Sequence, residues 1–186
     1  PQALEPFRSA PFRFQWTGDL LTSWAFEMES LILGWYVLVA TGSVILVALF
    51  GALQYLGTLV SPLFGVAGDR VGPRNMMCGM RLAYTIVAAA IMLLACSDSL
   101  TPVLALVFAG LAGMIRPSDL AMRNALIGQT LPHGQLLAAL AISRTTSDSA
   151  RIAGALAGAG LVAWLGIAKA YVIVTAFYAL GLAATL

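Results

Sequence analysis

The stretch Ile86–Ala95, which reads IVAAAIMLLA, decides the fold class of this chain. It contains no polar residue, and neither does Val103–Ala109, VLALVFA. Strands of a membrane barrel would instead alternate apolar and polar residues over segments of about ten residues. Over all 186 residues, 60% are hydrophobic and 10% are charged, against roughly 25% charged in soluble domains. The sequence therefore predicts an all-α polytopic membrane protein. It excludes a water-soluble globular protein, and a net charge of +2 without a basic run excludes nucleic acid as a partner.

Outward from this stretch, the apolar residues form six blocks, each long enough to cross a hydrocarbon layer ~30 Å thick as a helix. The predicted spans are residues 14–39, 43–67, 76–96, 102–125, 136–163 and 168–186. The connections are short and carry turn formers, among them Thr41-Gly42-Ser43 and Leu131-Pro132-His133-Gly134. We expect each connection to reverse the chain, so that both ends lie on one side of the membrane.

Basic residues near the span ends orient the helices, because short cytoplasmic loops carry an excess of Lys and Arg. One side has Arg8, Arg13, Arg70, Arg74, Arg81 and Arg123, whereas the other has only Lys169. We therefore expect both termini in the cytoplasm and the protein in the plasma (inner) membrane. The chain starts with Pro1 and stops inside an apolar run at Leu186. We expect residues 1–186 to be the N-terminal transmembrane half of a longer protein.

The chain has ten basic and eight acidic residues, and eight of these charges fall inside the predicted spans when Arg81, Arg123 and Lys169 are counted with the span ends, as above. They are Asp19, Glu27, Glu29, Arg116, Asp119, Arg144, Asp148 and Arg151. An unpaired charge costs about 2.5 to 3.5 kcal/mol at the centre of a spanning helix, so such groups face a cavity or one another and are candidate functional groups. For Asp119 and Arg123, which we place near the cytoplasmic surface, we expect solvated or snorkelling side chains.

Helix geometry places the acids of the first span on different faces. Asp19 and Glu27 share one face, whereas Glu29 lies about 200° from Glu27 and cannot point into the same cavity. Two interpretations of Asp19 and Glu27 remain open. They are either members of fixed ion pairs that align the helices, or acids that take up and release protons.

The fifth span carries a charged stripe of one acid between two bases. Arg144, Asp148 and Arg151 follow the spacing i, i+4 and i+7, which places them on one helix face. We expect this base-rich span and the acid-rich first span to form a complementary pair across a central cavity. A self-sufficient ion-pair stripe is the alternative.

Between the second and third spans the chain reads Gly65-Val66-Ala67-Gly68-Asp69-Arg70-Val71-Gly72-Pro73-Arg74-Asn75. Gly65 and Gly68 allow helix backbones to approach closely, and Gly72 with Pro73 favours a tight reversal. Asp69 beside two arginines offers a charge cluster that can be made or broken at modest cost. The pattern G-x-x-x-D-R-x-G-x-R resembles the cytoplasmic loop signature of the major facilitator superfamily of secondary transporters.

This resemblance implies that the six spans form one 3+3 inverted-repeat bundle, which is half of the usual twelve. It also implies a cytoplasmic gate motif, formed by Gly65, Asp69, Arg70, Gly72 and Arg74. In the family, the Asp of the motif pairs across the two halves and holds the cytoplasmic side shut. A second basic residue often ends the pattern, and Asn75 stands in its place here.

Two further features are similar to patterns of the same family. Gly154 and Gly158 resemble the antiporter motif of the fifth span, with Ala155 in place of its proline; helix packing alone is the alternative. Arg116 occupies a place like that of a fourth-span arginine linked to proton movement, although Pro117 departs from the usual glycine pattern. The whole chain is most similar to the exporter branch that includes siderophore and multidrug efflux proteins.

We therefore expect a proton-coupled antiporter that exports a small molecule by alternating access. The proton or substrate candidates are Asp19, Glu27, Arg116, Arg144, Asp148 and Arg151. The expected partners are the substrate, protons, the lipid bilayer and a second six-helix half, in the same chain or in another subunit. The alternative function is a non-transporting half-size membrane subunit that docks on a partner complex. No enzyme, metal or cofactor is expected, because a hydrolase needs a nucleophile and a base at matching depth and the one histidine, His133, lies in a loop.

Overall fold

The computed structural model describes residues 2–186, apart from the side chains of residues 2–4, 63, 66, 69 and 133. The described chain is helical and contains no strand. Its elements are the short 3-10 helix η1 (Gln2–Arg8), then α1 (Ala10–Thr41), α2 (Val44–Leu53), α3 (Gly57–Val71), α4 (Pro73–Cys96), α5 (Pro102–Thr130), η2 (His133–Gln135) and α6 (Leu136–Ala183). The predicted all-α class is confirmed for this part of the chain.

Glycines with positive φ and capping side chains set the limits of the helices. α1 ends at Gly42, whose φ of 65° is left-handed, and Ser43 caps α2 by accepting a hydrogen bond from the backbone N–H of Leu46 (3.4 Å). Gly72 alone, with φ 89°, separates α3 from α4, which begins at Pro73. The chain therefore turns where the sequence predicts, at residues 41–43 and at residues 72–73.

α6 contains a reversal at Gly166, whose φ of 77° and ψ of 170° are not helical. Before this residue, the close contacts with α1 advance together along both helices. Gly154 lies against Trp24, and Gly158 lies one turn further along against Met28. Residues 136–165 therefore run parallel to α1.

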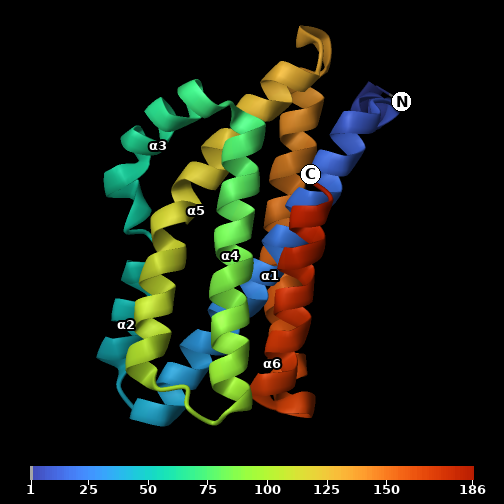
Figure 1. Cartoon of the computed structure of the whole chain (residues 1–186). Coiled ribbons are helices and arrows are strands. Elements are labelled where there is room, and N and C mark those ends of the chain that lie inside the picture. The colour runs from blue at the N-terminus through green and yellow to red at the C-terminus, as the bar shows by residue number, and fades with distance from the viewer. Residues whose placement is uncertain (1) are drawn as a thin grey trace.

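After Gly166 the direction of the contacts is opposite. Tyr178 bonds to Glu29, whereas Gly181, further along α6, lies against the earlier residue Gly18. Residues 167–183 therefore run antiparallel to α1, and the two segments of α6 correspond to the fifth and sixth predicted spans. Both chain termini accordingly lie at the same end of the bundle (Figure 1).

The second predicted span, residues 43–67, is wrong as a single helix. It divides into α2 and α3, and residues 54–56 between them form a turn in which the N–H groups of Tyr55 and Leu56 bond back to Ala52 and Leu53 (3.1 and 3.2 Å). Figure 1 shows α3 bowed away from α4.

The break lies against a special point of α5. Pro117 has no N–H, so the carbonyl of Gly113, four residues earlier, receives no helical hydrogen bond. A Cβ on Gly57 would lie only 2.6 Å from that carbonyl oxygen, and a Cβ on Gly113 would overlap the backbone of Gln54. Two glycines thus let the interrupted helix and the proline-containing helix touch through their backbones.

In the part of the chain that the structure describes, four stretches are long and apolar enough to cross a membrane, by length and composition alone: Val44–Pro62, Pro73–Cys96, Pro102–Thr130 and Leu136–Ala183. The last of these includes the reversal at Gly166. α1, which carries three acids, is not among them. Large apolar side chains such as Ile45, Leu59 and Trp164 are 80 to 91% exposed on the outside of the bundle, as expected for a surface that contacts lipid.

Candidate functional site

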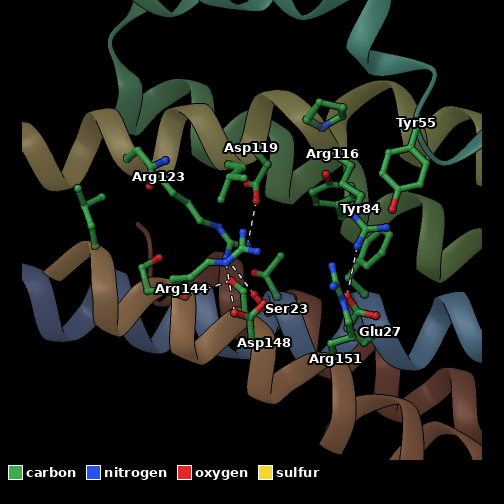
Figure 2. A pocket seen from close by; sticks show the side chains of 18 of the residues that line it. Ser23, Glu27, Tyr55, Tyr84, Arg116, Asp119, Arg123, Arg144, Asp148 and Arg151 are labelled. Atoms are coloured by element: carbon green, nitrogen blue, oxygen red, sulfur yellow. Dashed lines mark hydrogen bonds and ion pairs between the residues drawn. The ribbon is translucent and has the colours of Figure 1, made fainter. Parts of the chain in front are cut away.

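A cavity of about 620 Å³ lies among α1, α4, α5, α6 and the turn that leads into α3. Figure 2 shows charged side chains from α1, α5 and α6 pointing into it. The lining residues are Thr22, Ser23, Phe26, Glu27, Tyr55, Thr58, Tyr84, Arg116, Pro117, Asp119, Leu120, Arg123, Asn124, Leu140, Ser143, Arg144, Ser147, Asp148 and Arg151. Five of the six predicted proton or substrate candidates are among them, and Asp19 is not.

Arg116 of α5 connects three walls of the cavity. Its Nη2 lies 3.2 Å from Oε1 of Glu27 in α1, and its Nη1 donates a hydrogen bond to Oε1 of Gln54 in the turn after α2 (3.0 Å). The guanidinium lies over the ring of Phe26, 3.4 Å from its centroid, where the ring face attracts a cation. The Arg116 and Glu27 side chains remain 24% and 18% exposed, so a molecule in the cavity can reach this ion pair.

Asp19 lies behind the cavity in a buried network that joins α1, α4 and α5. Arg81 of α4 binds its Oδ1, and Nε of Arg123 in α5 lies 3.4 Å from the same oxygen without hydrogen-bond geometry. Arg123 also binds Asp119 (2.9 Å) and donates a hydrogen bond to Ser23 (2.9 Å). The network balances two acids against two bases, which lowers the cost of burying them.

The burial of this network corrects one prediction. Asp119 and Arg123, expected to be solvated or snorkelling near the surface, are only 6% and 5% exposed. Their i, i+4 spacing lets them pair along one face of α5, and packing of α5 against α1 and α4 covers them.

Arg81 is a member of the buried network that the sequence does not predict, because its place near a span end groups it with the basic residues of the cytoplasmic loop. Its side chain is completely buried, and besides Asp19 it contacts the Gly181 carbonyl (3.1 Å) and the Thr185 hydroxyl at the end of α6. A signal was present in the sequence: Arg81 lies eight residues, or ~12 Å, beyond Pro73, where α4 begins.

The charged stripe of the fifth predicted span lies on α6 at the edge of the cavity. Arg144 and Asp148 pair with each other at 3.2 Å and are 68% and 52% exposed. Arg151 is exposed, and Figure 2 shows it extending toward Glu27. The first and fifth predicted spans both line the cavity, but among the described side chains no ion pair joins α1 to α6. Arginines of α4 and α5 pair with the acids of α1 instead.

Glu29 points away from the cavity, as its position around α1 predicts. It is 5% exposed and absent from the cavity lining. The hydroxyl of Tyr178 in α6 donates a hydrogen bond to its Oε2 at 2.7 Å. Glu27 and Glu29 therefore belong to two separate environments.

The glycines of the predicted gate motif differ in their surroundings. A Cβ on Gly68 would lie 2.7 Å from Sδ of Met122 in α5, whereas a Cβ on Gly65 would meet nothing within 4 Å. The expected close approach is therefore found at Gly68, and the prediction for Gly65 is wrong. Gly72 adopts the positive φ that the reversal requires.

The charged residues of the gate motif lie at the end of the bundle that carries both termini (Figure 1). Arg70 is exposed, and Nε of Arg74 donates a hydrogen bond to the Thr185 carbonyl (3.3 Å). The side chain of Asp69, to which the resemblance gives the central role, lies outside the described residues. Arg74 thus ties the loop to the end of α6.

Gly154 and Gly158 lie where α6 contacts α1. A Cβ on Gly154 would come within 3.2 Å of the Glu27 Cβ, and one on Gly158 would come within 3.0 Å of the Met28 Cα. The small residues therefore let α6 approach the backbone of α1 directly beside Glu27, which sets the depth of that carboxylate in the cavity.

A family model described as transmembrane secretion effector matches residues 1–186, the whole chain. The chain belongs to this family. The transmembrane secretion effectors are part of the major facilitator superfamily, so the superfamily resemblance of the loop between α3 and α4 is confirmed. Membership indicates a multi-pass membrane transporter for small molecules and does not favour a non-transporting subunit. No curated protein matches the chain.

Proposed function

We propose that this chain forms the N-terminal half of a secondary active transporter that exports a small molecule in exchange for protons by alternating access. Its helical passes cross the plasma (inner) membrane as a 3+3 repeat, with both termini in the cytoplasm. The observation that carries the proposal is the cavity, which the Arg116–Glu27 ion pair and Arg151 line inside a bundle with an apolar outer surface. Charges at this depth are costly and mark substrate or ion pathways.

The walls of the cavity favour an amphipathic substrate. Phe26, Tyr55 and Tyr84 offer aromatic surface beside the Arg116–Glu27 pair. The turn between α2 and α3 and the proline of α5 both lie next to this pair, and interrupted helices near substrate sites are common in secondary transporters. A second six-helix half completes the cavity on its open side.

The two acids of α1 that we predicted as proton carriers have different roles in this proposal. Asp19 is held between Arg81 and Arg123 and aligns the helices. Glu27 is partly exposed and bound to Arg116. A substrate or a proton in the cavity therefore competes with Arg116 for the Glu27 carboxylate. Asp69, with Arg70 and Arg74, closes the cytoplasmic side.

Transport by the complete protein in proteoliposomes tests this function. Ethidium, Nile red and fluorescein serve as cationic, neutral and anionic amphipathic probes, and an internal pH dye records proton movement. We expect an imposed pH gradient to drive at least one probe and each transported probe to move protons in the opposite direction. Absence of gradient-driven movement for all three probes counts against the proposal.

Two variants test the acids of α1. We expect Glu27→Gln to weaken gradient-driven transport, because it removes the charge that Arg116 binds, while Glu5→Gln, an identical change at an exposed carboxyl, leaves it intact. Unchanged coupling in both Glu27→Gln and Asp19→Asn would show that neither acid takes part.

A further inference from the structure

Glu29 belongs to a second polar site, separate from the charged cavity. Its carboxylate accepts the hydroxyl hydrogen bond of Tyr178, and the Tyr178 ring stacks on Tyr84 of α4 with centroids 5.6 Å apart and planes 19° apart. Tyr171 lies two helical turns before Tyr178 on the same face of α6. It is fully buried, and its hydroxyl has no hydrogen-bond partner among the described residues. We call Tyr84, Tyr171 and Tyr178 the tyrosine cluster.

Glu29 differs from the other buried acids in having no cation beside it. Asp19 and Glu27 each bind at least one arginine, but no Lys or Arg among the described residues lies within 4 Å of the Glu29 carboxylate. Tyr178, which binds Glu29, belongs to the apolar core that also contains Ile32 and Leu33 of α1.

The titratable groups nearest this site come from α4, α5 and α6. α6 contributes Tyr171 and Tyr178, and α4 contributes Tyr84. α2 contributes no titratable side chain. The charged groups of α5 on this side of the bundle are Arg116, Asp119 and Arg123, and each is paired with another residue. No fixed charge therefore compensates a negative charge on Glu29.

A carboxylate in such a place is costly, whereas a neutral carboxylic acid that keeps one hydrogen bond is not. While the site excludes water, the Glu29 carboxyl is therefore stable only in its protonated, neutral form. It can release the proton only when water or polar groups reach the site. Tyr84 and Tyr178 connect Glu29 to the cavity, because Tyr84 lines the cavity and stacks on Tyr178, which binds Glu29.

We propose that Glu29 is a proton-binding site of this protein, and that the Tyr84–Tyr178 stack controls its access to the cavity. When the stack opens, the Glu29 carboxylate takes up one proton from cavity water and becomes a neutral acid. Closure buries the neutral acid, and opening to the other side of the membrane returns the proton to water. This inference rests on the proposed exchange of protons and assigns the proton to a residue other than Glu27.

Infrared spectroscopy of the complete purified protein tests proton binding without a substrate. A pH titration in H₂O and D₂O records the C=O band of a protonated carboxyl, which shifts with the exchangeable proton. We expect Glu29→Gln to lose one such band that Glu27→Gln and Glu5→Gln retain. Tyr178→Phe, which removes the hydrogen bond, is expected to move the pH at which the band appears.

A retained band in Glu29→Gln, with a titration like that of the unchanged protein, would overturn the proposal. If Glu29→Gln does not fold, Glu29→Asp keeps a carboxyl at the site and is expected to keep the band with a shifted midpoint. An identical midpoint in both Glu29→Asp and Tyr178→Phe contradicts the assignment.

The transport assay separates this inference from the proposed function. We expect Glu29→Gln to lose the component of probe movement that the pH gradient drives, while movement down the probe's own gradient continues. If the unchanged protein shows no gradient-driven transport, the proposed function fails. If it does and Glu29→Gln couples equally well, the function stands and the assignment of Glu29 fails.

Discussion

Replacement of Arg81 by methionine tests the buried network that holds α1 to α4 and α6. The side chain is fully buried and contacts Asp19, the Gly181 carbonyl and the Thr185 hydroxyl. Methionine has a comparable length but cannot make any of these contacts. Arg81→Met therefore leaves Asp19 buried with a single arginine, Arg123, at 3.4 Å.

Breaking a buried ion pair by removing one partner costs about 3 to 5 kcal/mol. Because Arg123 remains, we expect the lower end, about 3 kcal/mol, or roughly a hundredfold in the unfolding equilibrium. Asp19→Asn combined with Arg81→Met removes both charges and leaves the Arg123–Asp119 pair intact at 2.9 Å. The double variant should therefore be more stable than Arg81→Met alone.

Unfolding of the complete protein in mixed detergent micelles, followed by tryptophan fluorescence during titration with dodecyl sulfate, measures these free energies. Arg70→Met is the matched control, because Arg70 is exposed in the last turn of α3. The reasoning is refuted if Arg81→Met is no less stable than Arg70→Met. It is also refuted if the effects of Asp19→Asn and Arg81→Met add without coupling.

Three further predictions concern Gly158, Arg116 and Cys96. Gly158→Ala should destabilise the protein by about 1 to 3 kcal/mol through overpacking against α1, whereas Gly160→Ala, with open space around its Cβ, should be neutral or slightly stabilising in the same unfolding assay. Arg116→Lys should reduce probe transport roughly tenfold, because one ammonium cannot bind both Glu27 and Gln54 as the guanidinium does. An equal loss of transport in Arg144→Lys would contradict this reasoning. In a variant where Cys96 is the only cysteine, a membrane-impermeant maleimide should label it only from the side opposite the termini; labelling from the cytoplasmic side would refute the proposed orientation.

Several local features were predictable because their causes are local. A continuous apolar block can satisfy its backbone in lipid only as a helix, and this gives the all-α class. Gly42 and the Gly72-Pro73 pair end helices through their own backbone preferences. The angular separation of Glu27 and Glu29 follows from helix geometry alone, and the structure places the two acids in different environments.

The break between α2 and α3 was not predictable in the same way. Residues 54–56 contain no proline and no glycine, so nothing local ends the helix there. The break coincides with a contact to α5, where Pro117 leaves the Gly113 carbonyl without its helical partner and Gly57 approaches it. A feature that depends on two helices in contact cannot be predicted from either helix alone.

The sequence by itself determined that this protein is a helical membrane bundle and that its chain turns at Gly42 and at Gly72-Pro73. These properties depend on composition and on a period of 3.6 residues. Only the tertiary structure decided which charges meet. Arg81, assigned to the cytoplasmic side, lies in the core beside Asp19, and among the described side chains the arginines of α6 bind none of the three acids of α1. The pairing of charges depends on which helices pack together. Uncharged small residues such as Gly154 and Gly158, where α6 lies against α1, set that packing.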